Sequence, residues 1–424
     1  MHMSSNSEML GKLDAIARQT VFKHLGKDTQ AFIAEISDSY RFTFQEMRQL
    51  TEIARDLEMW SAPPLETLFP DEPQGKTVSK EEKKQVLKRI LNNWEELKKS
   101  PNRYDGAPQP FAIQADAITR DKERLGLGFC PVASAKTRCC NLLTLDAVEN
   151  CGYGCSYCSI QSFYSNNEVY FDSNFAEKLR NLDIDPDKTY HIGTGQSSDS
   201  LMWGNSHGVL DALIDFAERH PNVILELKTK SANISHLLRV DFPRNIICTW
   251  SLNTQTIIEN EELGSASLSA RLHAARQIAD KGRIVGFHFH PMIHYDNWRE
   301  DYGEVFRQLQ VIFRPGEVAL ISLGTLTYIK PVLKQIRQRG GASKILKMPL
   351  IEAEGKLSYP DATKLEMFSH AYNSFTEEWR QQVFFYLCME HHRFWQPVFG
   401  SDYASNEAFE QAMKQSYLEK IRNV

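Results

Sequence analysis

Three cysteines, Cys151, Cys155 and Cys158, lie within the eight-residue run Cys-Gly-Tyr-Gly-Cys-Ser-Tyr-Cys, and no fourth cysteine lies nearby. Thiolates in such a short loop can bind one metal centre together. An iron–sulfur cubane normally takes four thiolates, so a cubane held by three has one iron left for a small molecule. The spacing therefore predicts an iron–sulfur centre with one open coordination position.

The spacing of the three cysteines resembles the motif of the radical S-adenosylmethionine (SAM) superfamily. In that superfamily the open iron chelates the amino and carboxylate groups of SAM, and the cluster reductively cleaves SAM to a 5'-deoxyadenosyl radical. The resemblance implies a [4Fe-4S] cluster and S-adenosyl-L-methionine as cofactors. It also implies an electron donor such as flavodoxin or ferredoxin.

Zinc and disulfides are the alternative uses of these cysteines. A structural zinc ion takes four ligands, usually as two separated pairs, and the adjacent Cys139 and Cys140 are a poor source of the fourth. Disulfides are disfavoured because we expect no signal peptide and the sequence has only eight cysteines in 424 residues. We therefore expect reduced thiols in a cytoplasmic protein.

Length and charge limit the class of protein. A chain of 424 residues exceeds one ordinary core, so two or three structural units are expected. A net charge of −5 argues against coating nucleic acid by bulk electrostatics, although a local basic patch stays open. No apolar run approaches the roughly 20 residues needed to cross a bilayer, so we expect no membrane association.

Short apolar runs alternate with helical patterns from about residue 140, as in a parallel sheet of β/α units. Six such units make a partial barrel, with chemistry at the carboxyl ends of its strands. The predicted fold class is α/β, a partial (βα)6 TIM-like barrel of the radical SAM type. The predicted parts are a helical region at 1–125, the barrel at 126–345 and an α-rich capping segment at 346–424. The predicted strands are 142–147, 189–192, 223–229, 245–251, 284–289 and 318–323.

Two segments outside the predicted strands carry basic residues. Ser79 and Glu82 form a capping box for a helix that runs to Lys99, and its apolar stripe fits a packed surface helix, with a nucleic-acid role as the alternative. Residues 326–348 contain no acidic side chain, so they form either a solvated face or a phosphate-binding patch at the barrel rim. The basic residues of this run are Lys330, Lys334, Arg337, Arg339, Lys344 and Lys347.

Polar side chains repeat at every second position late in three successive predicted strands. A buried polar face is costly unless its groups bind a polar ligand or each other. SAM is such a ligand, and glycines beside Ser198 and Asp199 allow its close approach. Lys230 suits its carboxylate, and Ser251 and Asn253 suit its hydroxyls or amine. The repeating residues are Glu226, Lys228, Lys230, Thr249, Ser251, Asn253, His288 and His290.

Residues 125–400 resemble the spore photoproduct lyase family of radical SAM enzymes. The resemblance implies that the radical abstracts hydrogen from a thymine dimer of ultraviolet-damaged DNA, which must leave the base stack. It places Ser198, Asp199, Lys230 and Ser251 near SAM, and we add Tyr157, Asn253 and His288. The motifs that carry it are Cys130-Pro131, Cys151 to Cys158, Ser198-Asp199, Thr229-Lys230, Trp250-Ser251-Leu252-Asn253, Val285-Gly286-Phe287-His288, Asn297 to Tyr302, Ser322 to Thr325 and Tyr386 to Glu390.

Two positions depart from the family pattern. In the lyase a cysteine returns a hydrogen atom to the product, and at that position this chain has Gln196. Ser159 stands where the lyase has a tyrosine. The candidate catalytic residues are therefore Cys388, Cys140 and Tyr157, with Cys139 as a further possible donor; strand alternation points Cys248 toward the helices.

Three functions remain open from the sequence. The first is a lyase-like radical SAM enzyme that acts on a DNA lesion. The second is radical modification of RNA, a peptide or a metabolite, which Gln196 and Ser159 favour. The third is a metal-stabilised nucleic-acid-binding protein without catalysis.

Overall fold

The structure is a computed structural model that describes residues 16–70, 77–106, 112–113, 115–130, 136–160, 167–339, 341–353 and 355–423. The chain forms two compact units. The first comprises Met1–Gln109 with Tyr328–Leu357, and the second comprises Pro110–Thr327 with Ser358–Val424. Pro131, which is part of one family motif, lies outside the described residues. Within those residues, no helix has the length and apolar character needed to cross a membrane.

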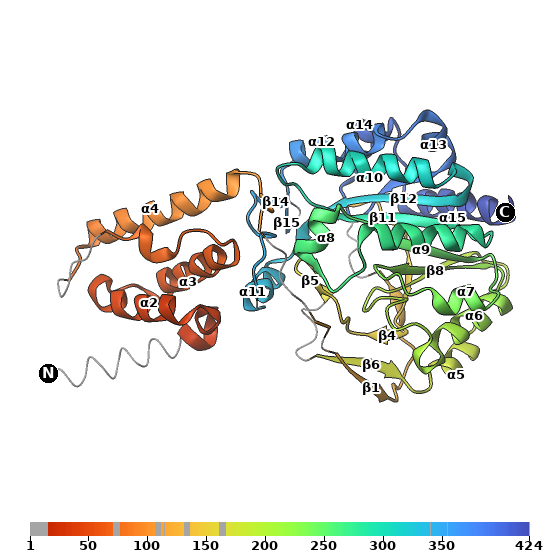
Figure 1. Cartoon of the computed structure of the whole chain (residues 1–424), viewed down its shortest axis with the longest axis horizontal. Coiled ribbons are helices and arrows are strands. Elements are labelled where there is room, and N and C mark those ends of the chain that lie inside the picture. The colour runs from red at the N-terminus through yellow and green to blue at the C-terminus, as the bar shows by residue number, and fades with distance from the viewer. Residues whose placement is uncertain are drawn as a thin grey trace. The chain divides into compact units, whose positions relative to one another are not determined.

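The second unit is built on a curled sheet of eight strands (Figure 1). Every neighbouring pair is parallel except β2 with β3. The predicted fold class is confirmed, and β2 and β16 extend the six predicted strands at the two edges. In sheet order the strands are β16 (Phe384–Leu387), β12 (Val318–Thr325), β11 (Val285–Met292), β9 (Ile246–Ser251), β8 (Val223–Thr229), β7 (Tyr190–Thr194), β3 (Leu143–Leu145) and β2 (Leu127–Phe129).

Helices cover one face of this sheet. Phe306 of α10 packs against Phe289 of β11, with ring centroids 5.0 Å apart. The central strands are almost entirely buried, and removing their apolar side chains from water drives this packing. Helices flanking the strands are α6 (Val209–Arg219), α7 (Ser235–Arg239), α9 (Leu268–Asp280) and α10 (Trp298–Ile312) (Figure 1).

The opposite face of the sheet is lined by polar side chains and covered in part by α15 (Asn406–Asn423). Tyr417 of α15 packs edge-on against His191 of β7, with ring centroids 5.5 Å apart. Because side chains alternate along a strand, His288 points to this face while Phe289 points to the helices. The remaining helices of the second unit are α5 (Phe175–Arg180), α8 (Gln255–Glu261), α12 (Asp361–Asn373), α13 (Glu377–Gln382) and α14 (Trp395–Phe399).

Shorter strands complete the structure. β4 (Val148–Glu149) and β6 (Glu168–Asp172) pair antiparallel, and β1 (Asp116–Arg120) pairs parallel with β6. β5 (Gly154–Cys155) pairs antiparallel with β10 (Glu262–Leu263), which ties the cysteine loop to the segment after α8. The last short strands are β13 (Thr327–Tyr328), β14 (Ile351–Ala353) and β15 (Lys356–Ser358).

The first unit is helical. Its helices are α2 (Lys27–Tyr40), α3 (Phe44–Met59), α4 (Lys80–Lys99) and α11 (Lys330–Gln338). The capping box that the sequence predicts at the start of α4 is present: the Ser79 amide donates to the Glu82 carboxylate at 2.9 Å, and the Glu82 amide donates to Ser79 Oγ at 3.2 Å.

Residues Tyr328–Leu357 belong to this helical unit, so the predicted boundaries at 125 and 345 differ from the observed division. The physical reason is an ion pair that sequence patterns do not reveal. Both Nε and Nη2 of Arg337 donate to the Asp56 carboxylate at 2.8 Å. Arg55 donates to the carbonyl oxygens of residues 337 and 339 at 2.8 and 2.6 Å.

Several basic side chains of residues 326–348 therefore bind other groups of the first unit. Lys334 Nζ donates to the Gln19 carbonyl at 3.3 Å, and Lys344 Nζ donates to the Arg103 carbonyl. Burial lowers the pKa of Lys347. Lys330 is 73% exposed and lies 3.5 Å from Glu352. A continuous phosphate-binding face made of all six residues does not fit these contacts.

Replacing Asp56 with Ala should destabilise the first unit by about 3–5 kcal/mol, because the substitution leaves the buried Arg337 guanidinium without its partner. Urea unfolding followed by circular dichroism measures the effect. The matched control is Glu96→Ala, which breaks an exposed pair with Lys99 and should change the free energy of unfolding by no more than about 1 kcal/mol. If both variants lose the same free energy of unfolding, the Asp56–Arg337 pair does not stabilise the first unit as proposed.

Candidate active site

The cysteine loop is fixed by backbone pairing. Cys155 lies opposite Glu262 in the β5–β10 pair, and the Ser156 amide donates to the Glu261 carbonyl at 2.9 Å. The Cys158 amide donates to the Cys155 carbonyl at 3.1 Å, which closes a turn between the second and third cysteines. The loop therefore presents its cysteines from a defined backbone.

All three loop cysteines line one cavity at the carboxyl ends of the parallel strands. The loop after β7 and the ends of β8, β9 and β11 supply the other walls. No group of three or more Cys, His, Asp or Glu residues among those described is placed to hold a single metal ion. The cavity is lined by Cys151, Tyr153, Cys155, Tyr157, Cys158, Ile160, Gly195, Gln196, Ser197, Ser198, Asp199, Lys228, Thr229, Lys230, Ser251 and His290.

Asp199 connects the β7 loop to the end of β8. Its Oδ1 accepts hydrogen bonds from the Leu201 and Met202 amides at 3.0 and 2.9 Å and from Thr229 Oγ1 at 2.7 Å. Its Oδ2 accepts from the Lys230 amide at 2.6 Å. Four donors from the protein occupy this carboxylate, so Asp199 shapes the cavity wall and sets the position of Lys230.

Ser198 offers a polar atom that the protein does not use. Its Oγ is buried and has no hydrogen-bond partner among the described residues, although buried hydroxyls are normally paired. Ser251 is 4% exposed and also lines the cavity, while its carbonyl accepts from Arg271 Nη1 at 2.8 Å. An orphaned buried hydroxyl beside three thiols fits a polar ligand in this cavity.

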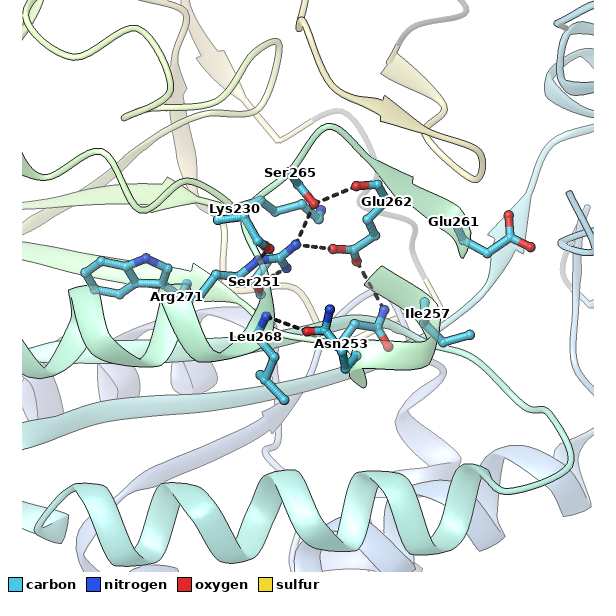
Figure 2. Close-up of polar contacts among 12 residues, drawn as sticks. Lys230, Ser251, Asn253, Ile257, Glu261, Glu262, Ser265, Leu268 and Arg271 are labelled. Carbon is cyan, nitrogen blue, oxygen red and sulfur yellow. Dashed lines mark hydrogen bonds and ion pairs between the residues drawn. The ribbon is translucent and has the colours of Figure 1, made fainter. Parts of the chain in front are cut away.

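Glu262, which lies opposite Cys155 in the β5–β10 pair, forms a buried ion pair with Arg271 (Figure 2). Arg271 Nη2 lies 2.7 Å from Glu262 Oε2, and both side chains are at most 1% exposed. Glu262 Oε1 accepts from Asn253 Nδ2 at 3.2 Å and from the Tyr157 hydroxyl. Arg271 also donates to Ser265 Oγ at 2.6 Å. The pair therefore joins the loop, β9 and α9 in one network.

Lys230 is a cation beside the cysteine loop. Its Nζ lies 5.5 Å from the centroid of the Tyr157 ring. Burial acts to lower the pKa of Lys230, but the neighbouring Glu262 and Cys155 outweigh it and raise this pKa. Lys230 is therefore protonated at neutral pH, as a carboxylate-binding residue must be.

Asn253 and His288 lie outside the lining of this cavity. Asn253 donates to Glu262 and to the Pro291 carbonyl at 3.1 Å, and it accepts from the Tyr302 hydroxyl at 2.5 Å. His288 contacts Glu226 Oε1 at 2.6 Å and Ser322 Oγ at 2.9 Å. The polar atoms of both side chains are thus bonded to other protein groups. His290, two residues further along β11, lines the cavity instead.

Cys140 and Cys388 lie in a second cavity, together with Cys130 and Cys139. Cys388 follows β16, and its amide donates to the Leu323 carbonyl at 2.8 Å. Burial raises the pKa of the Cys388 thiol to about 12, although the positive charge of Lys228 opposes this rise. Lys228, whose charge acts on this thiol, also lines the first cavity.

Glu262, Arg271 and Tyr302 are functional neighbours that sequence reasoning missed. They lie outside the strands whose alternation we followed. Glu262 directly follows α8, whereas Arg271 and Tyr302 lie in α9 and α10. The available signal was a buried charge, since Arg271 falls on the apolar face of α9 between Leu268 and Leu272.

A curled parallel sheet with a three-cysteine loop after its first parallel strand defines a protein of the radical SAM class. Residues 144–358, about half of the chain, match the family model described as spore photoproduct lyase. The chain therefore belongs to the spore photoproduct lyase family.

Curated relatives with the same name support this assignment. The chain is 26% identical over 203 residues to spore photoproduct lyase of Geobacillus sp. (strain Y412MC61), covering 45% of this chain and 58% of the relative. It is 27% identical over 175 residues to that of Clostridium acetobutylicum, covering 39% of this chain and 50% of the relative. The chain thus spans about half the length of the curated relatives it matches.

Solved structures share the fold. Spore photoproduct lyase complexed with dinucleoside spore photoproduct aligns with a TM-score of 0.53 and 19% identity, covering 68% of this chain and 89% of that chain. A double mutant of the lyase with bound AdoMet and dinucleoside spore photoproduct aligns with a TM-score of 0.52 and 17% identity, covering 71% and 94%.

The His288 site makes stability depend on pH. Burial lowers the pKa of His288 from 6.5 to about 4, with a smaller contribution from Lys228. The unfolded chain therefore binds more protons between these values, and stability should fall by an amount on the order of 3 kcal/mol as pH drops from 6.5 to 4. The pKa of Glu226 is well below 4.5, so its protonation lowers the folding stability further only at lower pH.

The pH effect can be measured by urea unfolding at several pH values. His288→Gln keeps an amide donor toward Glu226 and should flatten the dependence between pH 6.5 and 4.5. His273→Gln, at an exposed position of α9, is the matched control and should leave the slope unchanged. If the free energy of unfolding depends on pH equally in all three proteins, His288 is not the group responsible.

Proposed function

We propose that this protein is a radical SAM enzyme that acts on the spore photoproduct or a related thymine lesion in DNA. The observation that carries the proposal is the convergence of Cys151, Cys155 and Cys158 with Ser198 and Lys230 on one cavity. Relatives named spore photoproduct lyase, and a lyase structure that holds the dinucleoside lesion, support the choice of substrate.

In this proposal the three thiolates of the loop hold a [4Fe-4S] cluster. The bound cluster and SAM supply a 5'-deoxyadenosyl radical. With SAM bound, Lys230 would pair with its carboxylate, the Ser198 and Ser251 hydroxyls would hydrogen-bond it, and Tyr157 would line its binding site. Asp199, Asn253 and His288 hold the walls, because their polar atoms are occupied by the protein.

The cofactors imply a setting for the enzyme. A one-electron donor such as flavodoxin or ferredoxin would reduce the cluster, and a reducing compartment such as the cytoplasm keeps the thiols available. The domain arrangement we propose assigns the chemistry to the barrel unit alone. The helical unit is left for substrate or partner contacts, with the 73% exposed Lys330 as its candidate phosphate contact.

A carbon radical on the product must regain a hydrogen atom. Gln196 lines the cavity, and its strongly bonded amide hydrogens do not supply one. A thiol is the suitable donor, so we assign this role to Cys388, with Cys140 as its neighbour in the second cavity. Transfer breaks the S–H bond, forms a C–H bond and leaves a thiyl radical on Cys388.

A second function is radical modification of a substrate other than DNA. The specific observation that favours it is Gln196 inside the cavity, because an amide there can hydrogen-bond a polar substrate. In this case deuterium from a labelled RNA, peptide or metabolite, and not from dimer DNA, would appear in 5'-deoxyadenosine.

Anaerobically reconstituted protein, incubated with dithionite, SAM and DNA that carries the spore photoproduct, should convert the lesion to two thymine residues of the strand and form 5'-deoxyadenosine. Chromatography of the products measures both. Cys155→Ala should abolish both, because two thiolates hold the cluster poorly. Deoxyadenosine without thymine would reject the DNA substrate and retain the radical chemistry.

Replacing Cys388 with Ala should lower thymine formation at least about tenfold, or about 1.4 kcal/mol, because the product radical lacks its donor. SAM cleavage should persist. In D2O the wild type should place deuterium in the thymine product, since thiol hydrogens exchange with solvent. Cys248→Ala, which removes the buried thiol on the helix-covered face, is the matched control and should behave as wild type. Full repair by the Cys388 variant would refute the assignment.

A further inference from the structure

Four of the eight cysteines lie around one small cavity. Cys388 follows β16 and Cys130 follows β2, the two edge strands of the sheet. The bridge between Thr137 and His391 joins the same two parts of the chain. We call Cys139, Cys140 and Cys388 the seam thiols, because they lie where the two edges of the curled sheet come together.

The cavity leaves little room for a metal centre. Its volume is about 20 Å³, about enough for one water molecule. The chemistry left for adjacent thiols is the exchange of hydrogen and electrons among the sulfur atoms themselves.

The seam thiols differ in their chemical character. A hydrogen bond from Cys140 lowers the pKa of Cys139 to about 6, against the opposing effect of burial. The same hydrogen bond and burial raise the pKa of Cys140. Cys139 is partly exposed. In thiol–disulfide exchange a thiolate attacks first and a second, protonated thiol then resolves the mixed disulfide. A thiolate beside protonated thiols is suited to this reaction.

We propose that the seam thiols form a dithiol–disulfide redox centre whose co-reactant is a small disulfide. The Cys139 thiolate attacks one sulfur of that disulfide, forms a mixed disulfide and releases the first small thiolate. The Cys388 thiol then loses its proton to solvent and attacks the Cys139 sulfur, which releases the second small thiolate. Two protein thiols are oxidised to one disulfide, and the small disulfide is reduced to two thiols.

Cys388 is proposed as the resolving partner because it shares the cavity with Cys139 and is not its neighbour in the chain. Consecutive Cα atoms are about 3.8 Å apart, whereas disulfides usually join Cα atoms about 4.4–6.8 Å apart. A bond between Cys139 and Cys140 would therefore be strained. A bond from Cys139 to Cys388 would link the sheet's two edges across hundreds of residues, which should constrain the unfolded chain strongly.

The redox centre does not rest on the proposed function, although it has a consequence for it. If Cys388 donates hydrogen to the product radical, the disulfide form lacks the donor and should be inactive until reduced. Oxidation would then stop repair without damage to the cysteine loop.

The test is peptide mapping of the reconstituted, full-length protein after incubation with oxidised glutathione and alkylation of the remaining thiols. Cleavage after Asp146 or Glu149 separates the vicinal pair from the cluster cysteines. We expect a link between Cys139 and Cys388 that dithiothreitol reverses, and a rise in melting temperature of a few degrees. Cys248→Ala should form the same link.

Cys388→Ser should instead accumulate the mixed disulfide on Cys139. Circular dichroism checks that the variant is folded, and iodoacetamide labelling of wild-type Cys139 should be half-maximal near pH 6 whatever the fate of the variant. Full alkylation of the seam thiols after glutathione treatment, or a link confined to Cys139 and Cys140, would overturn the proposal. Because the readout is a covalent bond, it stands apart from success or failure of lyase activity.

Discussion

The ion pair between Arg271 and Glu262 is the contact on which the catalytic site depends. Taking both charges out of water is expensive, and breaking such a pair costs about 3–5 kcal/mol because one charge is left buried alone. The cost is offset here by further hydrogen bonds from Tyr157 and Asn253 to the carboxylate. Since Glu262 also begins the strand that pairs with the cysteine loop, the pair sets where the three thiols lie.

A second carboxylate performs a similar task on the other wall. Asp199 accepts hydrogen bonds from the backbone of its own loop and from the end of β8. With both acids engaged by the protein, the polar groups left to face the cavity include Lys228, Lys230 and the hydroxyls of Ser198 and Ser251. Such a set attracts a carboxylate and hydroxyl groups, so the wall chemistry suits the amino-acid end and the ribose of SAM.

Local patterns explain why the strands and the cysteine loop were predictable from the sequence. Alternation identifies which face of a strand a residue occupies, but not its depth in the barrel, so it did not distinguish buried His288 from cavity-lining His290. Short β16 carries no such pattern, and the Asp56–Arg337 pair joins residues almost 300 positions apart. Contacts of that range come from tertiary packing, which single-sequence patterns do not encode.

With Gln196 in place of a thiol, the proposed hydrogen donor Cys388 would come from a different strand end of the sheet. Gln196 follows β7, near the β2 edge, whereas Cys388 follows the edge strand β16. Hydrogen transfer needs the thiol close to the radical carbon, so the substrate would have to extend from the cysteine loop past Lys228 and His290 toward β16. A lesion bound in that direction would place its phosphates near Lys228. Because Cys388 shares its cavity with Cys139, oxidation of this proposed donor would also stop turnover.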